Sequence, residues 1–353
     1  MLLPHPLRLP MSSRNGTLQT LIPKFGRTRV LVIGDLMLDE FIWGRVSRIS
    51  PEAPVPVVWI QRESTMPGGA ANVANNIRAL GGHVNIVGTV GRDRWGETLL
   101  KDLSSRQMGV GGIVRVDRPT TVKTRVIAHH QQVVRVDREQ LEPLPSRVVD
   151  QLIAAVKKQL VDVDAVVIED YGKGVIARQL LEAIVPLVRA KRKIITVDPK
   201  QEHFDLYRGV TALTPNRQEA GEAVGRELET GEEIRQAGEE ILRRLHSDAL
   251  LITLGEDGMC LFERNGRRTM IPTVAQEVFD VAGAGDTVIA TFTLALASGA
   301  TLEQAARIAN HAAGVVVGKV GVAVVTPSEL RAKLSSPTAP GLRTARGPLK
   351  PRQ

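Results

Sequence analysis

The sequence predicts an α/β protein with a doubly wound, mostly parallel central sheet and a smaller β-sheet beside it. Short apolar runs alternate with longer helix-compatible segments, which is typical of parallel strands joined by crossover helices. Two segments, 41–62 and 112–136, depart from this alternation and predict an extra β-layer. The polar motifs follow the apolar runs directly, at the edge where open α/β sheets bind their ligands.

The composition is that of one large globular domain with basic ends. The chain has 353 residues, 43% of them hydrophobic, and a formal net charge of +8. Nine basic residues lie in 1–29 and 337–353, which contain no acid, so the segment between them carries a net charge of about −1. Since aromatic residues make up only 3% as well, we expect no nucleic-acid partner. We expect residues 1–28 and 334–353 to be disordered and residues 29–333 to form the folded domain.

The apolar runs and the cysteine content predict the compartment. We expect no membrane span and no signal peptide, because the longest apolar runs are far shorter than a bilayer requires. The single cysteine, Cys260, excludes an internal disulfide and fits a reducing environment. A cytoplasmic protein is therefore expected.

The first apolar run, 29–34, predicts a buried strand that ends at two acidic residues. Asp35 follows the strand directly, and Asp39 comes four residues later. Carboxylates at that edge can accept hydrogen bonds from sugar hydroxyls. A turn-capping role is the alternative, which we favour less for Asp35 and leave open for Asp39.

A glycine turn precedes an asparagine-rich helix in the next segment. Gly68 and Gly69 give a tight turn, and the helix that follows begins with several asparagines. Because asparagine is a poor residue inside a helix, Asn72 is a candidate for binding sugar hydroxyls. We expect Asn76 to cap the helix or face solvent.

The two irregular segments predict a small sheet that covers the site as a lid. Segment 41–62 contains three prolines that forbid a helix, and 112–136 alternates apolar and polar residues as a solvent-facing ribbon does. Their cations are candidates for an anionic group on a substrate, with solvated side chains as the alternative: Arg45, Arg48, Lys123 and Arg125. A homodimer that covers the apolar face of this lid is expected.

The second half of the chain returns to β-α alternation, with strands expected at 165–170, 193–200, 210–213 and 249–255. Polar residues again follow these strands: Lys200, Asn216, Arg217, Gln218, Glu219, Thr253, Gly255 and Gly258. A long helix with one small-residue face comes last and contains Asn310. Strand carboxyl ends that meet at one edge predict a single cleft.

The stretch 280–287 predicts a phosphate-binding turn that opens a helix. Gly283, Ala284 and Gly285 are small enough for backbone N–H groups to approach an anion, and the helix N-terminus adds a positive dipole. Asp286 lies in the first turn. An anion site beside a carboxylate suits phosphoryl transfer to a hydroxyl, whereas a capped glycine turn is the plain alternative.

The order of these motifs resembles that of ribokinase-like (PfkB-type) carbohydrate kinases. The matching motifs, over about residues 29–330, are Gly34-Asp35, Gly68-Gly69 with Asn72, Asn216 with Glu219, Thr253 and Gly255 with Gly258, and Gly283 to Asp286. Segments 48–57, 68–77, 129–139 and 169–175 resemble, within that family, the bacterial D-glycero-β-D-manno-heptose 7-phosphate kinases. Those enzymes phosphorylate the anomeric hydroxyl with ATP and Mg²⁺ and supply the ADP-heptose route to lipopolysaccharide core sugars.

The resemblance implies a role for each motif. Asp286 would act as the base, and the N–H groups of Ala284, Gly285 and Asp286 would stabilise the transferring phosphoryl group. Glu219, through water, and Asn216 would position Mg²⁺ and the nucleotide phosphates. The nucleotide pocket would include Arg217, Gln218, Thr253, Gly255, Gly258 and Asn310, with Lys200 as a further phosphate ligand or an exposed lysine. The sugar hydroxyls would be bound by Asp35, Asp39, Gly68, Gly69 and Asn72.

One residue departs from the family pattern, and other functions remain open. Ala282 stands where threonine is usual, so a contact near the phosphates is weakened while the backbone anion site is kept. The alternatives are a related kinase for fructose 1-phosphate, ribose or a nucleoside, and a catalytically silent sugar- or nucleotide-binding regulator. A dehydrogenase is disfavoured because the first strand lacks the G-x-G-x-x-G turn.

Overall fold

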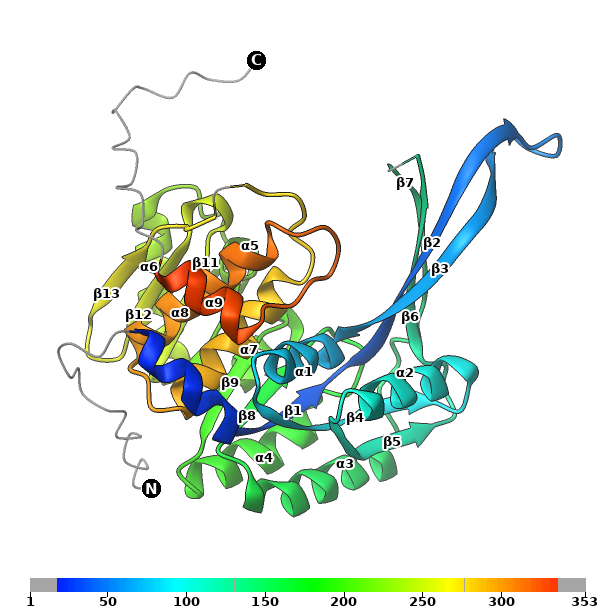
Figure 1. Cartoon of the computed structure of the whole chain (residues 1–353). Helices are drawn as coiled ribbons and strands as arrows, with labels where there is room; N and C mark the ends of the chain where they lie inside the picture. Colours follow the sequence, from blue (N-terminus) through cyan, green and yellow to red (C-terminus); the bar gives the residue numbers. More distant parts are fainter. Residues whose placement is uncertain (1–17, 130, 276, 336–353) are drawn as a thin grey trace, which may run out of the picture.

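The computed structural model describes residues 18–129, 131–275 and 277–335. Figure 1 shows a body in which helices cover both faces of a large sheet, and a long β-arm that projects from that body. The predicted α/β architecture with a second, smaller sheet is confirmed.

The large sheet has nine strands in the order β13-β12-β11-β10-β9-β8-β1-β4-β5. The strands from β11 to β5 pair in parallel, whereas β12 and β13 add an antiparallel edge. Their bounds are Arg29–Gly34 (β1), His83–Gly91 (β4), Gly109–Val116 (β5), Ala165–Glu169 (β8), Ile194–Asp198 (β9), Ala212–Leu213 (β10), Ala249–Thr253 (β11), Met259–Glu263 (β12) and Arg268–Ile271 (β13). β1 and β8 are apolar on both faces because helices cover both.

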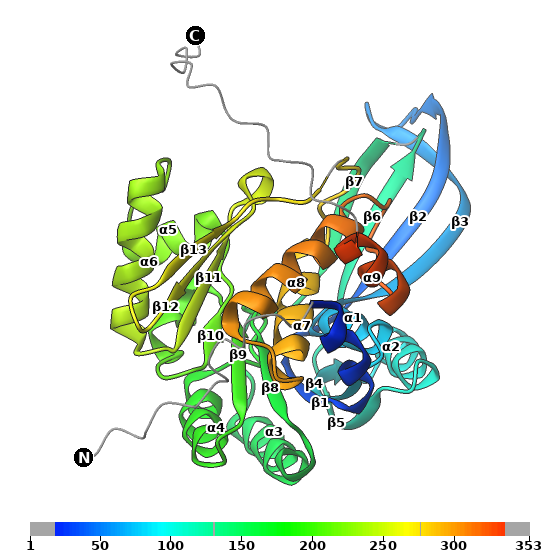
Figure 2. The same cartoon turned by 60° about the vertical axis from the view of Figure 1, so that its left-hand side comes forward.

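Helices pack on both faces of the large sheet, as Figure 2 shows from a second direction. One face carries α1 (Ala70–Ala79), α2 (Arg94–Ser105), α7 (Ala284–Ala297), α8 (Leu302–Val316) and α9 (Pro327–Ser335). The other carries α3 (Ser146–Gln159), α4 (Arg178–Ala190), α5 (Arg217–Val224) and α6 (Gly231–Leu245). Short 3-10 helices complete the elements at Leu18–Arg27 (η1), Leu160–Asp162 (η2), Gln201–Leu206 (η3) and Gly255–Asp257 (η4).

The strand order places a topological switch point beside β1. The chain passes from β1 to β4 and β5 on one side and then returns to β8 on the other. Gly34 pairs in register with Glu169, which pairs with Asp198 of β9. Three neighbouring strands therefore deliver acidic residues to one edge, where such sheets bind ligands.

The smaller sheet is the β-arm of Figure 1 and forms the lid. It has four strands in the order β3-β2-β6-β7, with bounds Leu36–Ile49 (β2), Pro56–Gly69 (β3), Thr121–Ala128 (β6) and Gln131–Arg138 (β7). β2 begins two residues after β1 ends, so the lid grows directly out of the ligand-binding edge. Large apolar side chains lie exposed on it, among them Trp59 at 71% and Val136 at 55%.

Two predicted boundaries are wrong. The lid segment 112–136 begins too early, because Gly109–Val116 pairs in parallel with β4 in the large sheet and only β6 and β7 enter the lid. Residues 18–27 are not disordered: they form η1, which buries Leu21, Ile22 and Phe25 against the core. That apolar stripe outweighs the basic composition. Residues 1–17 and 336–353 lie outside the described residues.

The described ends of the chain lie together. Gln19 Nε2 in η1 donates a hydrogen bond of 2.7 Å to Ser335 Oγ at the end of α9. Among the described residues, no helix combines the length and hydropathy needed to cross a bilayer.

Candidate active site

The turn before α7 brings the helix N-terminus to the sheet edge. Gly283 has φ 75°, and a Cβ there would lie 2.9 Å from Asn72 Nδ2, so conformation and space both require glycine. The Asp280 carboxylate accepts N–H groups from Ala282 at 2.9 Å and Gly321 at 3.2 Å, which holds the turn. Ala282 is exposed. The turn is held by the Asp280 carboxylate, so it does not need a threonine side chain at position 282.

Asp286 lies in the first turn of α7, with 5% of its surface exposed. Asn72 Nδ2 donates to its Oδ2 at 2.6 Å, and Tyr171 OH donates to its Oδ1 at 2.8 Å. Burial raises the pKa of Asp286, while these two hydrogen bonds oppose the rise. Asp286 is therefore a precisely oriented carboxylate whose pKa is shifted toward that of a useful base.

Two further carboxylates face Asp286. Oxygen atoms of Glu169, Asp198 and Asp286 lie within 4.8 Å of one another. Burial, and then the charges of neighbouring acids, raise the pKa values of Glu169 and Asp198 well above their ordinary range. Both oxygens of Glu169 are buried without a hydrogen-bond partner among the described residues. Such an arrangement is costly without a cation, and an all-oxygen donor set suits Mg²⁺.

Sequence reasoning placed the metal on Glu219, which lies beside this cluster and outside it. Asn216 and Glu219 form the capping box of α5, in which Asn216 Oδ1 and Glu219 Oε2 each accept the other's N–H at 2.9 Å. The charge of Glu219 contributes to the raised pKa of Asp198, so Glu219 still faces the acidic centre. Burial raises the pKa of Glu219, and the charge of the half-buried Lys200 opposes that rise.

Arg217 and Gln218 were predicted to bind the nucleotide and are engaged on the surface of α5. Arg217 pairs with Asp257, and Gln218 Nε2 donates to Glu222 Oε1 at 2.8 Å. Neither residue lines the cavity described next.

Four of the predicted nucleotide residues meet at one cavity of about 540 Å³ beside the start of α7, whereas Lys200, Asn216 and Glu219 do not line it. Thr253, Gly255, Gly258, Asn310, Ala284 and Gly285 line it together with apolar residues such as Val278, Val281, Met259 and Val317. Gly258 has φ 90°, and a Cβ there would lie 2.1 Å from Ile271 O, so the hairpin wall needs glycine. Asn310 Nδ2 donates to Pro272 O at 2.7 Å and holds the opposite wall. An apolar cavity that ends at a helix N-terminus suits a nucleotide, with the nucleobase in the cavity and the phosphates at the helix end.

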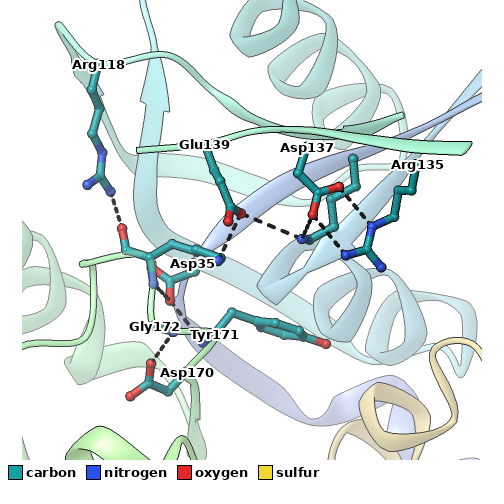
Figure 3. Close-up of polar contacts among 10 residues, drawn as sticks. Asp35, Arg118, Arg135, Asp137, Glu139, Asp170, Tyr171 and Gly172 are labelled. Atoms are coloured by element: carbon teal, nitrogen blue, oxygen red, sulfur yellow. Dashed lines mark hydrogen bonds and ion pairs between the residues drawn. The ribbon is translucent and has the colours of Figure 1, made fainter. Parts of the chain in front are cut away.

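Asp35, the carboxylate that follows β1, is surrounded by backbone N–H groups. Asp35 is 1% exposed and accepts backbone N–H groups from Tyr171, Lys173 and Val175, each at 3.0 Å. Burial raises its pKa and these N–H groups lower it. Figure 3 shows the Asp35 carboxylate beside the turn that contains Tyr171 and Gly172. Asp35 thus holds the 170–175 turn in place, which is the turn-capping role that sequence reasoning favoured less than sugar binding.

The remaining predicted sugar ligands pack tightly around the base of the lid. A Cβ at Gly69 would lie 2.6 Å from Asp35 O, and one at Gly68 would lie 2.5 Å from Asp39 Oδ2. Asp39 is buried and pairs with Arg125, and its charge contributes to the raised pKa of Asp286. Asp39 therefore lies at the base of the lid, near enough to Asp286 for its charge to act on that carboxyl.

The four lid cations are not equivalent. Arg45 and Arg48 are exposed, on the part of β2 beyond the irregularity at Trp43/Gly44. Lys123 and Arg125 lie near the base of the lid, on β6, and pair with acids: Lys123 with Asp137 and Glu139, and Arg125 with Asp39. The four predicted cations therefore form an inner pair, Lys123 and Arg125, and an outer pair, Arg45 and Arg48.

Sequence reasoning missed four polar residues. Glu169 and Asp198 end β8 and β9, and Tyr171 and Lys173 lie in the turn after β8, so a place at strand carboxyl ends is the signal that could have found them. Asn76 was expected to cap or face solvent, but it is buried: its Nδ2 donates to Asn72 O at 3.0 Å, and its Oδ1 accepts from Thr287 Oγ1 at 2.9 Å. It ties α1 to α7 and so supports Asn72 and Asp286 together.

Comparisons with known proteins agree with this geometry. The sequence model described as "pfkB family carbohydrate kinase" matches residues 27–329. The "Bifunctional protein HldE" of Trichlorobacter lovleyi is 45% identical over 318 residues, which are 90% of this chain and 65% of that protein. The protein of the same name from Geobacter metallireducens is 46% identical over 301 residues, 85% of this chain and 61% of that protein. The chain spans less than two thirds of the length of these relatives.

Solved structures confirm the fold. Phosphofructokinase-2 from Escherichia coli, in complex with potassium, superposes with a TM-score of 0.74 at 20% identity and covers 87% of this chain and 98% of that chain. Ribokinase from Arabidopsis thaliana, complexed with ribose and ATP, gives 0.69 at 20% identity, with 88% and 99% covered. With the family match over most of its length, the chain belongs to the pfkB family of carbohydrate kinases, which transfer a phosphoryl group to a hydroxyl.

Proposed function

We propose that the chain phosphorylates the anomeric hydroxyl of D-glycero-β-D-manno-heptose 7-phosphate, with ATP as donor and Mg²⁺ as cofactor, to give the 1,7-bisphosphate. The observation that carries the proposal is the orientation of Asp286 by Asn72 and Tyr171 at the N-terminus of α7. The similarity to HldE proteins supports the heptose assignment. The reaction would supply ADP-heptose for lipopolysaccharide precursors in the cytoplasm.

The chain's own groups provide the elements of the reaction. Asp286 accepts the proton of the attacking hydroxyl, and its raised pKa brings it closer to neutral pH than an ordinary aspartate. Exposed backbone at Gly285 and the dipole of α7 stabilise negative charge on the transferring group; Ala284 N–H already donates to Val281 O at 3.2 Å. Glu169 and Asp198, which lie beside Asp286, would hold Mg²⁺ and leave Asp286 free to act as the base. The ion would neutralise charge on the donor phosphates.

A panel of acceptors tests the proposal. ADP release would be measured with the heptose 7-phosphate, fructose 1-phosphate, ribose and a nucleoside, with kcat/KM as the criterion. We expect the heptose 7-phosphate to give the highest value. A higher value for another acceptor would move the chain to a related kinase, and ligand binding without turnover by any acceptor would indicate a silent regulator.

We also propose that two copies associate through their lids. β7 is exposed along its whole length, and Trp59, Ile60, Val134 and Val136 leave a large apolar surface on the lid. A second lid is a self-complementary cover for such a surface.

A further inference from the structure

We propose that Lys173 and Lys123 bind the phosphate that the acceptor already has, and that Glu139 is the internal counter-ion which this phosphate replaces. The inference rests on the proposed function, because it assigns the acceptor's phosphate within the same site. It combines Lys173 from the body with Lys123 from the lid. It also makes Glu139 a competitor of the phosphate for these two lysines.

The two ammonium groups converge on one oxygen atom. Lys173 Nζ lies 2.9 Å from Glu139 Oε2, and Lys123 Nζ lies 3.7 Å from the same atom. The lysine side chains are only 15% and 16% exposed. Figure 3 shows Glu139 pointing toward the turn that contains Tyr171 and Gly172, with Asp137 and Arg135 beside it. Two cations from different layers of the fold thus surround a position that holds an oxyanion.

Glu139 occupies that position poorly. Its Oε2 is buried and receives no hydrogen bond of acceptable geometry, although Lys173 Nζ is within ion-pairing distance. Glu139 follows the last residue of β7, so the ladder of the lid does not hold its backbone. A carboxylate has one negative charge and two oxygens, whereas a phosphate monoester has nearly two charges and three oxygens. Replacement of Glu139 by a phosphate therefore strengthens the attraction to both lysines.

The place of the lysines relative to Asp286 suits a sugar phosphate. Lys173 lies two residues after Tyr171, which donates to Asp286. Lys123 pairs in register with Asp39, whose charge acts on Asp286. Each cation thus neighbours a residue that acts on Asp286 while belonging to another element of the fold, an arrangement that suits a phosphorylated end held apart from the reacting hydroxyl.

Arg118 supports this assignment by holding Lys173 from behind. Arg118 Nη2 donates to Lys173 O at 2.7 Å, and the Lys173 N–H donates to Asp35 at 3.0 Å. Since backbone atoms make both contacts, a change of the Lys173 side chain leaves the turn supported. The variant Lys173→Met therefore tests the ammonium group without removing these contacts.

The test compares heptose 7-phosphate with the same heptose lacking the phosphate. We expect Lys173→Met to raise the KM for the phosphorylated acceptor by about 10- to 100-fold, the range for loss of a charged hydrogen bond. Lys123→Met should act in the same direction but less strongly, because Asp137 shares Lys123. The KM for ATP and the kcat/KM for the unphosphorylated heptose should not change. Lys157→Met, at an exposed position near the end of α3, is the matched control.

Glu139→Gln separates the proposal from a purely structural tether between lid and body. Under the proposal this variant lowers the KM for the phosphorylated acceptor, because the competing charge is gone. If Glu139→Gln and Lys173→Met impair both acceptors alike, the pair is a tether and the assignment is wrong. If another sugar phosphate in the panel is the better acceptor, the same variants test the assignment with it. An enzyme that accepts only unphosphorylated sugars would overturn the assignment.

Discussion

At the scale of single residues, each carboxylate oxygen of Asp286 accepts a hydrogen bond from a different side chain. Asn72 lies on α1 and Tyr171 lies in the turn after β8. Two separate elements therefore orient the carboxylate before a substrate binds. Asparagine at position 286 would keep the size of the side chain but lose its basicity.

We therefore expect Asp286→Asn to lower kcat by about 10²- to 10⁴-fold, the usual contribution of a general base. Nucleotide binding, measured by calorimetry, should stay near that of the unaltered protein because the cavity walls are unchanged. Asp248→Asn is a control at a half-buried acid paired with Arg264, outside the candidate site. Near-normal turnover by Asp286→Asn would remove the base assignment.

The acidic cluster leads to a second prediction at this scale. The pKa values of Glu169 and Asp198 are higher in the folded chain than in the unfolded chain, so the folded state holds these protons more tightly. Their contribution favours folding at low pH and is lost as pH rises through the raised pKa values. Mg²⁺ should therefore raise Tm more at pH 8 than at pH 5, with about 2.7 kcal/mol gained at 100 times Kd.

Thermal melting with and without MgCl₂ measures this effect. Glu169→Gln should raise Tm in the absence of Mg²⁺, because one buried charge is removed, and should reduce the shift that Mg²⁺ produces. An unchanged Mg²⁺ shift in this variant would place the ion elsewhere.

At the scale of elements, the turn between β8 and α4 connects several parts of the site. Asp35 accepts its backbone N–H groups, Arg118 holds Lys173 O, and Asp170 anchors the start of the turn through Gly172 N–H at 2.8 Å. η3 supports the same turn, because His203 Nδ1 lies 2.6 Å from Asp170 Oδ2 and Tyr207 OH donates to that oxygen. The orientation of Tyr171 thus depends on an element that is far away in the sequence.

This support should depend on pH. The hydrogen bond to Asp170 raises the pKa of His203 above its ordinary 6.5, with smaller contributions from the charges of Glu202 and Asp35. The stabilising contribution is therefore fully present below pH 6.5 and lost as pH rises through the raised pKa. Urea denaturation from pH 6 to pH 9 should show a fall in the free energy of unfolding that is smaller in His203→Gln. Equal falls in the two proteins would contradict the prediction.

The elements themselves could largely be predicted, whereas their pairing could not. Short apolar runs such as 29–34 and 165–170 predict buried strands. The glycine and small residues at 283–285 predict the start of α7. The sheet to which 109–116 belongs depends on its pairing with β4, which no local pattern records. Asp35 looks the same in sequence whether it meets a sugar or three backbone N–H groups. The convergence of Glu169, Asp198 and Asp286 likewise arises from strand order.

At the scale of the whole molecule, the lid is the part that lacks a second layer. Its strands extend away from the body in Figure 1, and the apolar surface on it has no cover among the described residues. Trp59 is the largest of these exposed side chains.

We expect a homodimer in analytical ultracentrifugation at micromolar concentration. Trp59→Glu should shift the population to monomer, because a charge in an apolar interface stays unpaired. Val161→Glu adds the same charge at an exposed residue of the body, 66% exposed, and should leave the dimer intact. A monomeric unaltered protein, or a Trp59→Glu variant that still dimerises fully, would contradict the lid interface.

The hydrogen bond between Gln19 and Ser335 places the described ends of the chain side by side. The fold therefore tolerates, in principle, a circular permutation in which a short linker joins η1 to α9. New ends could be opened at the exposed Asn265-Gly266 turn between β12 and β13, on the antiparallel edge of the sheet. Such a chain would begin with β13 and α7, which contains Asp286, would reach the lid later and would end with β12. The order in which the lid and α7 are synthesised could then be separated from the geometry that they share.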